Sequence, residues 1–387
     1  MFKVPKRNLI IDCLGVRIGE QRGGERFMCG IIAELGSTQN TDFLLVINES
    51  CLEFVKGLIP PSQYLLVPIS GKNRVYRMLV QMIAGPVIAR LSGAALYTSS
   101  SVFPTLGFPC PTSAILHDLL LYSFPKEFNR ATWIGRTALL KASLATLSAV
   151  FTSSHASAED IKARFKKHAR SVHVVPGGAS QTVAPRVGRE REVAILNQLA
   201  LKDRKFVLSV LGGGRFKNQR GLAEAADKLL QRGRDDIEVI VVGDALRVFK
   251  TMQYGRCLRA LGFVSDEVLT VLYANAQALI CPTFFEGFGL PIIEAQAAGL
   301  PVICSDIPVL REVAGQSAVF VDPRSAESIA EGMITVLDSP QLRQRLIKLG
   351  KENAALFTWQ RTTEQFLAAC RAVIGPVGVE QSLTTSV

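Results

Sequence analysis

The 387-residue chain has few aromatic residues, few histidines and no cysteine pair at Cys-x-x-Cys spacing. Aromatic residues make up 7% of the chain and are not interleaved with basic residues as in RNA-binding signatures, which argues against a nucleic-acid partner. The 4 histidines and 8 cysteines form no group at metal-ligand spacing. We therefore expect reduced, buried thiols and no bound metal ion.

Long uncharged apolar runs are also absent. The most apolar predicted helix covers residues 72–91, and its uncharged part, Met78–Ala89, is shorter than the roughly 20 residues that cross a membrane. Basic residues and one proline interrupt this helix, namely Lys72, Arg74, Arg77, Arg90 and Pro86. Such a helix either lies on a membrane with its basic residues at the headgroups or packs its apolar side into the core.

Acidic residues are scarce in the N-terminal half. Residues 1–180 hold about 20 Lys/Arg against about 11 Asp/Glu, so roughly 9 of the net charge of +11 lies there. An anionic acceptor or an anionic membrane surface would attract this excess, and a solvated basic surface is the alternative. No apolar signal-peptide core precedes the first predicted strand. We expect a cytoplasmic protein that contacts the inner face of the membrane peripherally.

Short apolar runs alternate with helical patterns along the chain, which is typical of βαβ units and a parallel sheet. The hydrophobic content of 48% fits sheets that are buried on both faces. The predicted strands cover 8–14, 43–48, 63–69, 94–100, 113–117, 149–153 and 172–176, and then 205–211, 238–243, 278–282 and 302–305. The helices predicted among the later strands cover 218–231, 266–276 and 291–298.

A segment that is first Gly/Pro/Ser-rich and then charged, residues 176–198, separates the two series of strands and is interpreted as a linker. The sequence thus predicts an α/β protein with two doubly wound, Rossmann-like parallel-sheet domains facing across a cleft. We place the N-terminal domain at 1–178 and the C-terminal domain at 179–357. Residues 375–387 are expected to fray. In such sheets, ligands bind at the carboxyl ends of the strands.

Two carboxylates, Glu286 and Glu294, follow the predicted strand 278–282. Pro291 suits the first turn of a helix, and Gly299 followed by Pro301 ends it, so Glu294 lies in the first helical turn. A carboxylate at this position also complements the helix dipole, so a purely structural role is the alternative interpretation of Glu294. Glu286 precedes a Gly-Phe-Gly turn, where a carboxylate has little structural purpose. Carboxylates bind sugar hydroxyls and helix N-termini bind phosphate, so this segment suits a nucleotide sugar.

A glycine-rich segment, Gly212–Gly214, directly follows the predicted strand 205–211, and Arg215 and Lys217 come next. The glycines allow the backbone to approach a ligand closely, and the two basic side chains bring positive charge to the position of a pyrophosphate. A glycine turn with exposed basic residues is the alternative interpretation.

Two segments of the N-terminal half also follow predicted strands. Gly23 and Gly24 open a helix after the first strand and form a second loop of the size that binds phosphate. His117, followed by Asp118, ends the strand 113–117, where an imidazole can orient a substrate or move a proton. A lone histidine is otherwise most often structural or solvated.

These residues together resemble a GT-B glycosyltransferase, in particular the retaining family 4, the group 1 glycosyltransferases. The segment from Glu286 to Val302 resembles that family's Glu-x7-Glu signature and the residues downstream of it. One departure is that a single residue separates Arg215 from Lys217, where many members have several, so the assignment of Lys217 is the firmer one. Further matches occur in the order in which the family has them: Gly23-Gly24, His117-Asp118, Ser153-Ser154, Val174–Gly177, Lys217-Asn218, Gly262–Glu267 and Phe357–Trp359. The last of these resembles the start of a helix, over 358–375, that returns to the N-terminal domain.

The resemblance implies a role for each matching residue. Glu286 would hold hydroxyls of the donor sugar, and Glu294 would bind the ribose. Arg215 and Lys217 would neutralise the leaving diphosphate, and His117 would contact the transferring sugar. The other donor-binding positions that the resemblance implies are Gly24, Gly213, Gly214, Val264, Gly287, Phe288, Gly289 and Leu290. It implies catalysis by charge stabilisation, without a metal or other cofactor.

The implied activity is transfer of a hexose from a UDP- or GDP-sugar to a lipid-linked or surface polysaccharide, with retention and with mannose as the sugar to test first. One alternative is a catalytically silent paralogue that binds a nucleotide sugar, which loss of Glu286 or Glu294 would have favoured. Another is a dinucleotide-dependent oxidoreductase. That class uses a Gly-x-Gly-x-x-Gly loop, which neither Gly212–Gly214 nor Gly23-Gly24 completes.

Overall fold

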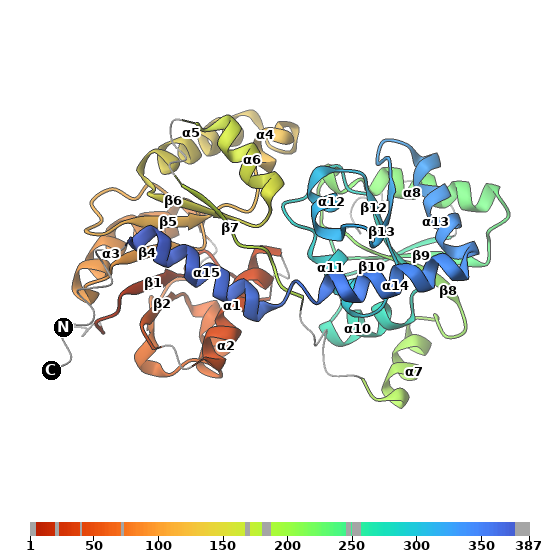
Figure 1. The fold of residues 1–387 in the computed structure, drawn as a ribbon, viewed down its shortest axis with the longest axis horizontal. Coiled ribbons are helices and arrows are strands. Elements are labelled where there is room, and N and C mark those ends of the chain that lie inside the picture. Colours follow the sequence, from red (N-terminus) through yellow and green to blue (C-terminus); the bar gives the residue numbers. More distant parts are fainter. Residues whose placement is uncertain are drawn as a thin grey trace. The chain divides into compact units, whose positions relative to one another are not determined.

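The computed structural model of the chain describes residues 5–19, 23–38, 41–70, 73–166, 171–179, 187–244, 249 and 257–375. The chain forms two compact units. Unit 1 comprises Met1–Gly178 and Trp359–Val387, and unit 2 comprises Ala179–Thr358. Each unit is an α/β structure with its own parallel sheet (Figure 1). The alternation of strands and helices in the sequence predicted this fold class.

Unit 1 contains a seven-stranded sheet in the order β3-β2-β1-β4-β5-β6-β7, and all neighbouring strands are parallel. Its strands are β1 (Leu9–Asp12), β2 (Phe43–Ile47), β3 (Tyr64–Leu66), β4 (Leu96–Ser99), β5 (Thr112–Ile115), β6 (Ala149–Thr152) and β7 (Val172–Val174). Its α-helices are α1 (Gly23–Ser37), α2 (Leu52–Lys56), α3 (Arg74–Ser92), α4 (Leu120–Ser123), α5 (Arg130–Thr146), α6 (His155–Arg164) and α15 (Trp359–Ile374).

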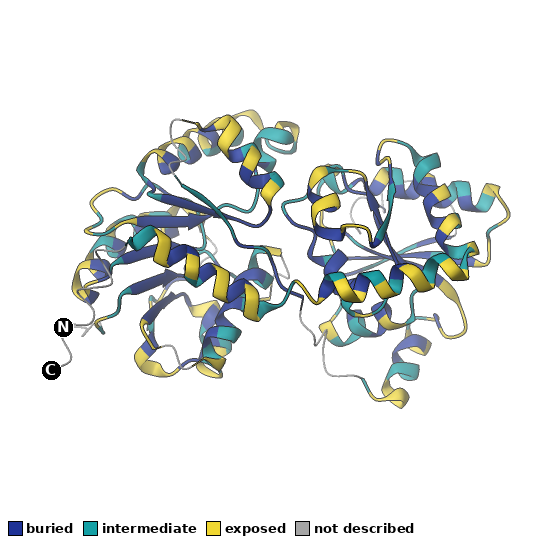
Figure 2. Cartoon of the chain, in the orientation of Figure 1, coloured by how far each residue is buried: buried dark blue, intermediate teal, exposed yellow. Residues whose placement is uncertain are grey.

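The side chains of β1 alternate between two cores, one on each face of this sheet. Leu9 and Ile11 share a core with buried residues of α1 and with Phe366 of α15. Ile10 lies in a different core together with Ile88 of α3. Because both faces are covered, the inner strands are buried along their whole length, as the dark blue strands of Figure 2 show, whereas the edge strands β3 and β7 are only half-buried.

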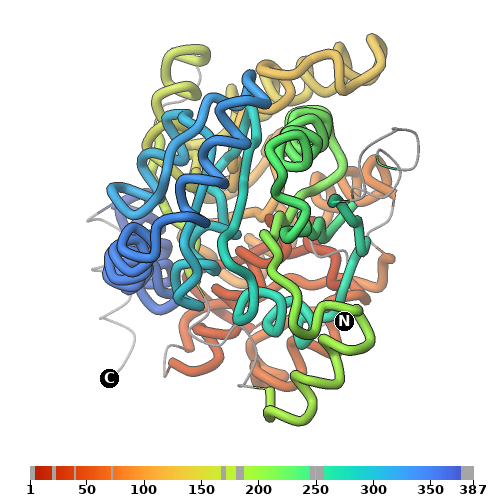
Figure 3. Tube along the Cα trace, turned by 90° about the vertical axis from the view of Figure 1, so that its right-hand side faces the viewer, coloured from red at the N-terminus to blue at the C-terminus, as the bar shows by residue number. Residues whose placement is uncertain are grey.

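Unit 2 contains a six-stranded sheet in the order β10-β9-β8-β11-β12-β13, again parallel throughout. Helices α8, α13 and α14 contribute apolar side chains to the core on one face of this sheet. The path of the chain through the unit runs from green to blue in Figure 3. The strands are β8 (Lys205–Val210), β9 (Ile237–Val242), β10 (Leu258–Gly262), β11 (Ala278–Cys281), β12 (Val302–Ser305) and β13 (Ala318–Val321). The α-helices are α7 (Arg189–Gln198), α8 (Gln219–Gln231), α10 (Asp266–Asn275), α11 (Leu290–Ala297), α12 (Pro308–Ala314), α13 (Ala326–Asp338) and α14 (Pro340–Ala354).

The structure departs from the sequence-based expectations at three places in unit 2. The edge strands β10 and β13 were not predicted, because most of their residues are only half-buried and their apolar signal is weak. The expectation of a linker is also wrong for the charged end of residues 176–198. This end forms α7, whose Ile195 and Leu196 are buried. Residues 180–186 of that linker, and the expected fraying of residues 376–387, lie outside the described residues.

Helix α15 packs against α1 at a position that admits only glycine. A Cβ atom on Gly30 of α1 would overlap the indole ring of Trp359. The same ring makes an edge contact with Phe27, with ring centroids 6.3 Å apart. The last helix of the chain therefore completes the core of unit 1.

Gly30→Ala tests this packing. Alanine alone would favour the helix by about 1 kcal/mol relative to glycine. The overlap with Trp359 should outweigh this gain and destabilise the protein by roughly 1–3 kcal/mol. Gly135→Ala in α5 is the matched control, because no atom lies within 4 Å of its added Cβ, and it should raise the thermal unfolding midpoint. If both variants raised the midpoint, α1 and α15 would not pack as described.

Candidate active site

Most of the predicted site residues follow a strand at the point where the strand order of each sheet reverses, while His117 follows β5 and Val264 follows β10. In unit 1 this point lies between β1 and β4, and in unit 2 it lies between β8 and β11. The loops that leave the carboxyl ends of two such neighbouring strands diverge and leave room for a ligand. Gly24 and His117 belong to unit 1, and the other predicted residues belong to unit 2.

A charged pair joins the two loops at the reversal point of unit 2. Lys217 ends a short 3₁₀ helix, Arg215–Lys217, in the loop after β8, and Glu286 lies in the loop after β11. Nζ of Lys217 donates a hydrogen bond of 2.6 Å to Oε1 of Glu286. Their side chains are only 18% and 11% exposed, so each charge is largely removed from water and depends on the other.

Asn218, next to Lys217, holds these loops in place. Its backbone is left-handed, with φ of 56°, and its side-chain oxygen accepts from the N–H of Gly221 to cap α8. Its Nδ2 donates to the carbonyl oxygens of Pro282, at 2.8 Å, and Pro323, at 2.7 Å. One buried amide thus connects the loops that follow β8, β11 and β13. Nothing in the sequence distinguishes it from an ordinary helix cap.

The glycines of both loops have local reasons to be glycine. A Cβ atom on Gly213 would lie 2.5 Å from Oδ2 of Asp244, and one on Gly214 would overlap the ring of Phe216. Gly289 has a φ of 101° and precedes α11, which begins at Leu290 without a side-chain cap. At that helix start, after the half-buried Gly287 and the buried Phe288, Pro291 has no N–H and Ile292 donates 2.9 Å to the carbonyl of Gly289, which leaves the N–H of Leu290 to face outward.

Glu294 is 9% exposed and has a partner that sequence reasoning missed. The hydroxyl of Tyr273, in α10, donates 2.9 Å to its Oε2 and so fixes the carboxylate. A tyrosine on the apolar side of a helix looks like a core residue, so no sequence signal reveals this contact. Of the remaining predicted residues, Val264 is half-buried in the loop between β10 and α10, and Arg215 is exposed.

The site of unit 1 is a pocket of about 210 Å³ at the carboxyl ends of β1, β4 and β5. Its lining comes from the loop after β1, the first turns of α1, the end of β4 and His117. A Cβ atom on Gly24 would lie 3.4 Å from Nε2 of His117, so the two predicted residues face each other across a van der Waals contact. The pocket also contains Arg17 and Glu25.

His117 is neutral in this pocket. Burial lowers its pKa from 6.5 to about 4. Phe27 lies edge-on to the imidazole, with ring centroids 5.0 Å apart. Near neutral pH the ring therefore offers one donor and one acceptor to a ligand and no positive charge.

Comparisons with known proteins bear on the family and the fold. A family model described as "Glycosyl transferases group 1" matches residues 193–353, which lie in unit 2. O-antigen chain mannosyltransferase B of Escherichia coli is 29% identical over 264 residues, covering 65% of this chain and 68% of that protein. MMP alpha-(1->4)-mannosyltransferase of Mycolicibacterium hassiacum is 28% identical over 256 residues, covering 63% of this chain and 59% of that protein. The crystal structure of a glycosyltransferase from Rickettsia africae matches the fold with a TM-score of 0.71 at 16% identity, covering 96% of this chain and 99% of that chain.

Replacing Asn218 should loosen the loops of unit 2. Asn218→Ala leaves the carbonyls of Pro282 and Pro323 without their donor, which should destabilise the protein by about 1–3 kcal/mol in urea unfolding. Asn218→Gly accommodates the left-handed backbone but also lacks the side-chain amide. Its free energy of unfolding should therefore fall by nearly as much. A glycine variant as stable as the wild type would mean that only the backbone conformation matters here.

His117 should make the stability depend on pH. Between pH 6.5 and about 4 the unfolded chain binds a proton that the folded pocket excludes, so the free energy of unfolding should fall as the pH falls through this window. Above the window His117 contributes no pH dependence. His117→Gln should flatten the slope measured by urea unfolding, whereas the same change at the exposed His155 should not. An unchanged slope in His117→Gln would contradict the burial of this imidazole.

Proposed function

We propose that the chain is a glycosyltransferase of group 1 and that it transfers mannose from a UDP- or GDP-sugar to a lipid-linked saccharide with retention at the anomeric carbon. The observation that supports this most is the Lys217–Glu286 pair at the reversal point of unit 2. Its cation suits a diphosphate and its carboxylate suits sugar hydroxyls. The mannosyltransferase names of the two relatives favour mannose as the sugar.

We infer that the pair exchanges partners when the donor binds. Removing one member of a buried ion pair typically costs about 3–5 kcal/mol, because the other charge is left alone. A nucleotide sugar avoids this cost, because it gives each side chain a new partner. Lys217 then binds the diphosphate, and Glu286 binds hydroxyls of the sugar. The backbone N–H of Leu290, at the start of α11, adds a donor in the loop of Glu286, and Glu294, fixed by Tyr273, takes the ribose.

The proposed reaction needs no nucleophilic side chain. The bond between the anomeric carbon and the diphosphate oxygen breaks, and the acceptor hydroxyl attacks from the same face. The departing diphosphate takes the acceptor's proton. Negative charge grows on the phosphate as the bond breaks, so Lys217 and Arg215 stabilise the transition state more than the ground state. The proposal includes no metal ion, because these two cations carry out the neutralisation.

Helix α3 supports a peripheral contact with a membrane. Its buried face includes Arg77, Gln81 and Gly85, and Gln81 donates 2.6 Å to Asp12 beneath it. The core-facing interpretation holds for part of this helix, because Ile88 and Ala89 lie in the core and Met78 and Met82 pack against it. Its exposed apolar side chains are Val75 (62%), Tyr76 (56%), Leu79 (48%), Ile83 (71%), Val87 (54%) and Leu91 (52%). Among the described helices, none is long and apolar enough to cross a bilayer. We propose that α3 lies flat on an anionic membrane.

A catalytically silent paralogue is the second candidate. It would bind the donor at the same residues and release it unchanged. Both acids of the signature, Glu286 and Glu294, are present, which favours the enzyme.

Sugar transfer by the wild type separates the enzyme from the silent paralogue, and Glu286→Gln tests the assigned site. The amide cannot pair with Lys217 or hold the sugar in the same way, so transfer should fall by at least about 100-fold. A thermal-shift screen against UDP, GDP and ADP should identify the base, and the variant should still bind that nucleotide. Glu352→Gln, an exposed acid of α14, is the control and should turn over normally. Normal transfer by Glu286→Gln would show that the site is assigned wrongly.

Co-sedimentation with anionic vesicles tests the contact through α3. Each apolar side chain moved from water into lipid contributes about 1.5–3 kcal/mol, so Leu79→Glu with Ile83→Glu should abolish binding at low salt. Leu356→Glu removes an exposed apolar side chain of unit 2 and should leave binding unchanged. If the wild type failed to co-sediment at low salt, the membrane contact would be ruled out.

A further inference from the structure

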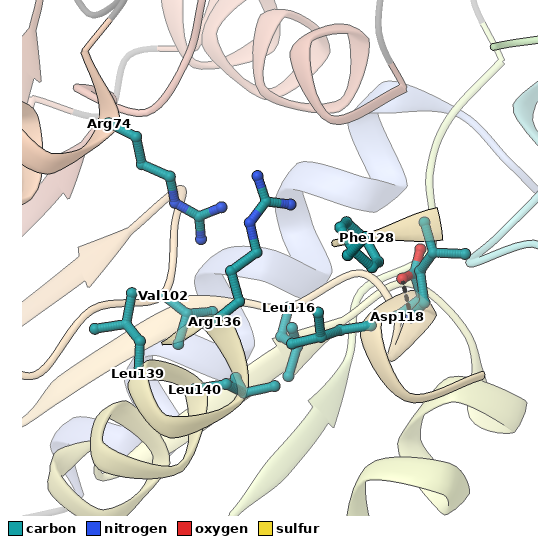
Figure 4. A pocket seen from close by; sticks show the side chains of 10 residues that line it. Arg74, Val102, Leu116, Asp118, Phe128, Arg136, Leu139 and Leu140 are labelled. Atoms are coloured by element: carbon teal, nitrogen blue, oxygen red, sulfur yellow. Dashed lines mark hydrogen bonds between the residues drawn. The ribbon is translucent and has the colours of Figure 1, made fainter. Parts of the chain in front are cut away.

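A second pocket of unit 1, of about 200 Å³, combines positive charge with an apolar wall (Figure 4). Arg74, the first residue of α3, and Arg136, of α5, reach into it and point their guanidinium groups toward each other. Its apolar wall includes Val102, Leu116, Phe128, Leu139 and Leu140. Pockets for whole drug-sized ligands measure roughly 300 Å³ or more, so this one accommodates only the head of a larger molecule.

Two arginines and one acid line this pocket, so its lining carries an excess of positive charge. Within the part of the chain that the structure describes, no ion pair joins Arg74 or Arg136 to an acid. Burial lowers the pKa of Arg74, and repulsion from Arg136, Arg77 and Arg17 lowers it further. Cations that face one another in this way gain from an anion placed between them.

The acid that lines this pocket also has a structural task. Asp118, the acid of the lining, accepts a 2.8 Å hydrogen bond from the N–H of Leu120 and so caps α4. The guanidinium of Arg136 lies over the ring of Phe128, 5.0 Å from its centroid, which holds the side chain in place without neutralising it.

The two pockets of unit 1 are neighbours along the chain. Leu116 and Asp118 line the arginine pocket, and His117 between them lines the pocket that contains Gly24. The same short stretch of chain therefore contributes to both pockets.

We propose that the arginine pocket binds the diphosphate of a lipid-linked acceptor, with the first carbons of the hydrocarbon chain on the apolar wall. This inference rests on the proposed function and deepens it. The rest of the hydrocarbon chain leaves the pocket at the start of α3, where Val75 begins the exposed apolar side of that helix. The saccharide of the acceptor extends toward His117.

Calorimetry with the full chain tests the pocket with three probes: farnesyl diphosphate, farnesol and inorganic pyrophosphate. Farnesyl diphosphate should bind most tightly, because it alone combines the anion and the apolar chain. Arg74→Gln and Arg136→Gln should each weaken its binding by at least about tenfold. Arg136→Lys should recover part of the loss, since it restores the charge but not the planar fork. Arg130→Gln, on the same helix and outside the pocket lining, is the control and should bind like the wild type.

Two results would overturn the inference. One is equal binding of farnesyl diphosphate by the wild type and by a folded Arg74→Gln, Arg136→Gln double variant. The other is equal affinity for pyrophosphate and farnesyl diphosphate, which would reveal a site for free phosphate instead of a lipid. UDP and GDP binding and sugar transfer are measured on the same samples. If they persist while farnesyl diphosphate does not bind, only this inference fails, and if they are absent, the proposed function fails as well.

Discussion

The hydrogen bond between Lys217 and Glu286 constrains unit 2 because neither charge is stable alone at such low exposure. It connects the loops of two strands whose connections diverge, and Asn218 fixes the same loops through the carbonyls of Pro282 and Pro323. A ligand that separates the pair must supply an anion to one side and hydroxyl donors to the other. A nucleotide sugar has both groups, joined at the bond that is to be broken.

In unit 1, by contrast, positive charge and apolar surface are accessible to molecules other than the chain itself. Helix α3 packs some apolar side chains, such as Ile88, into the core and exposes others, such as Ile83, on its outer side. Arg74 and Arg136 face each other at one end of that helix. A lipid surface and a lipid-bound anion would resolve both features. The basic excess of the N-terminal half is thereby concentrated into a specific arrangement.

Sequence periodicity predicted both parallel sheets because buried strands such as β8 and β11 consist of nearly continuous apolar runs. It missed the half-exposed edge strands β10 and β13, whose pattern is weak. The loops that carry Lys217 and Glu286 were predicted, since charged residues and glycines follow those strands. Their direct contact, across 69 positions of sequence, was not. Tertiary packing, which no local pattern encodes, determines three other contacts. These are the hydrogen bond of Tyr273 to Glu294, the two carbonyls bound by Asn218 and the approach of Arg74 to Arg136.

A crystal structure of the full chain with its nucleotide sugar bound tests the central claim, the exchange of partners at Lys217 and Glu286, most directly. We predict that Nζ of Lys217 will lie about 2.7–2.9 Å from a diphosphate oxygen and that Glu286 will accept from a hydroxyl of the sugar. A nucleotide sugar bound elsewhere, with the hydrogen bond between Lys217 and Glu286 intact, would contradict the claim.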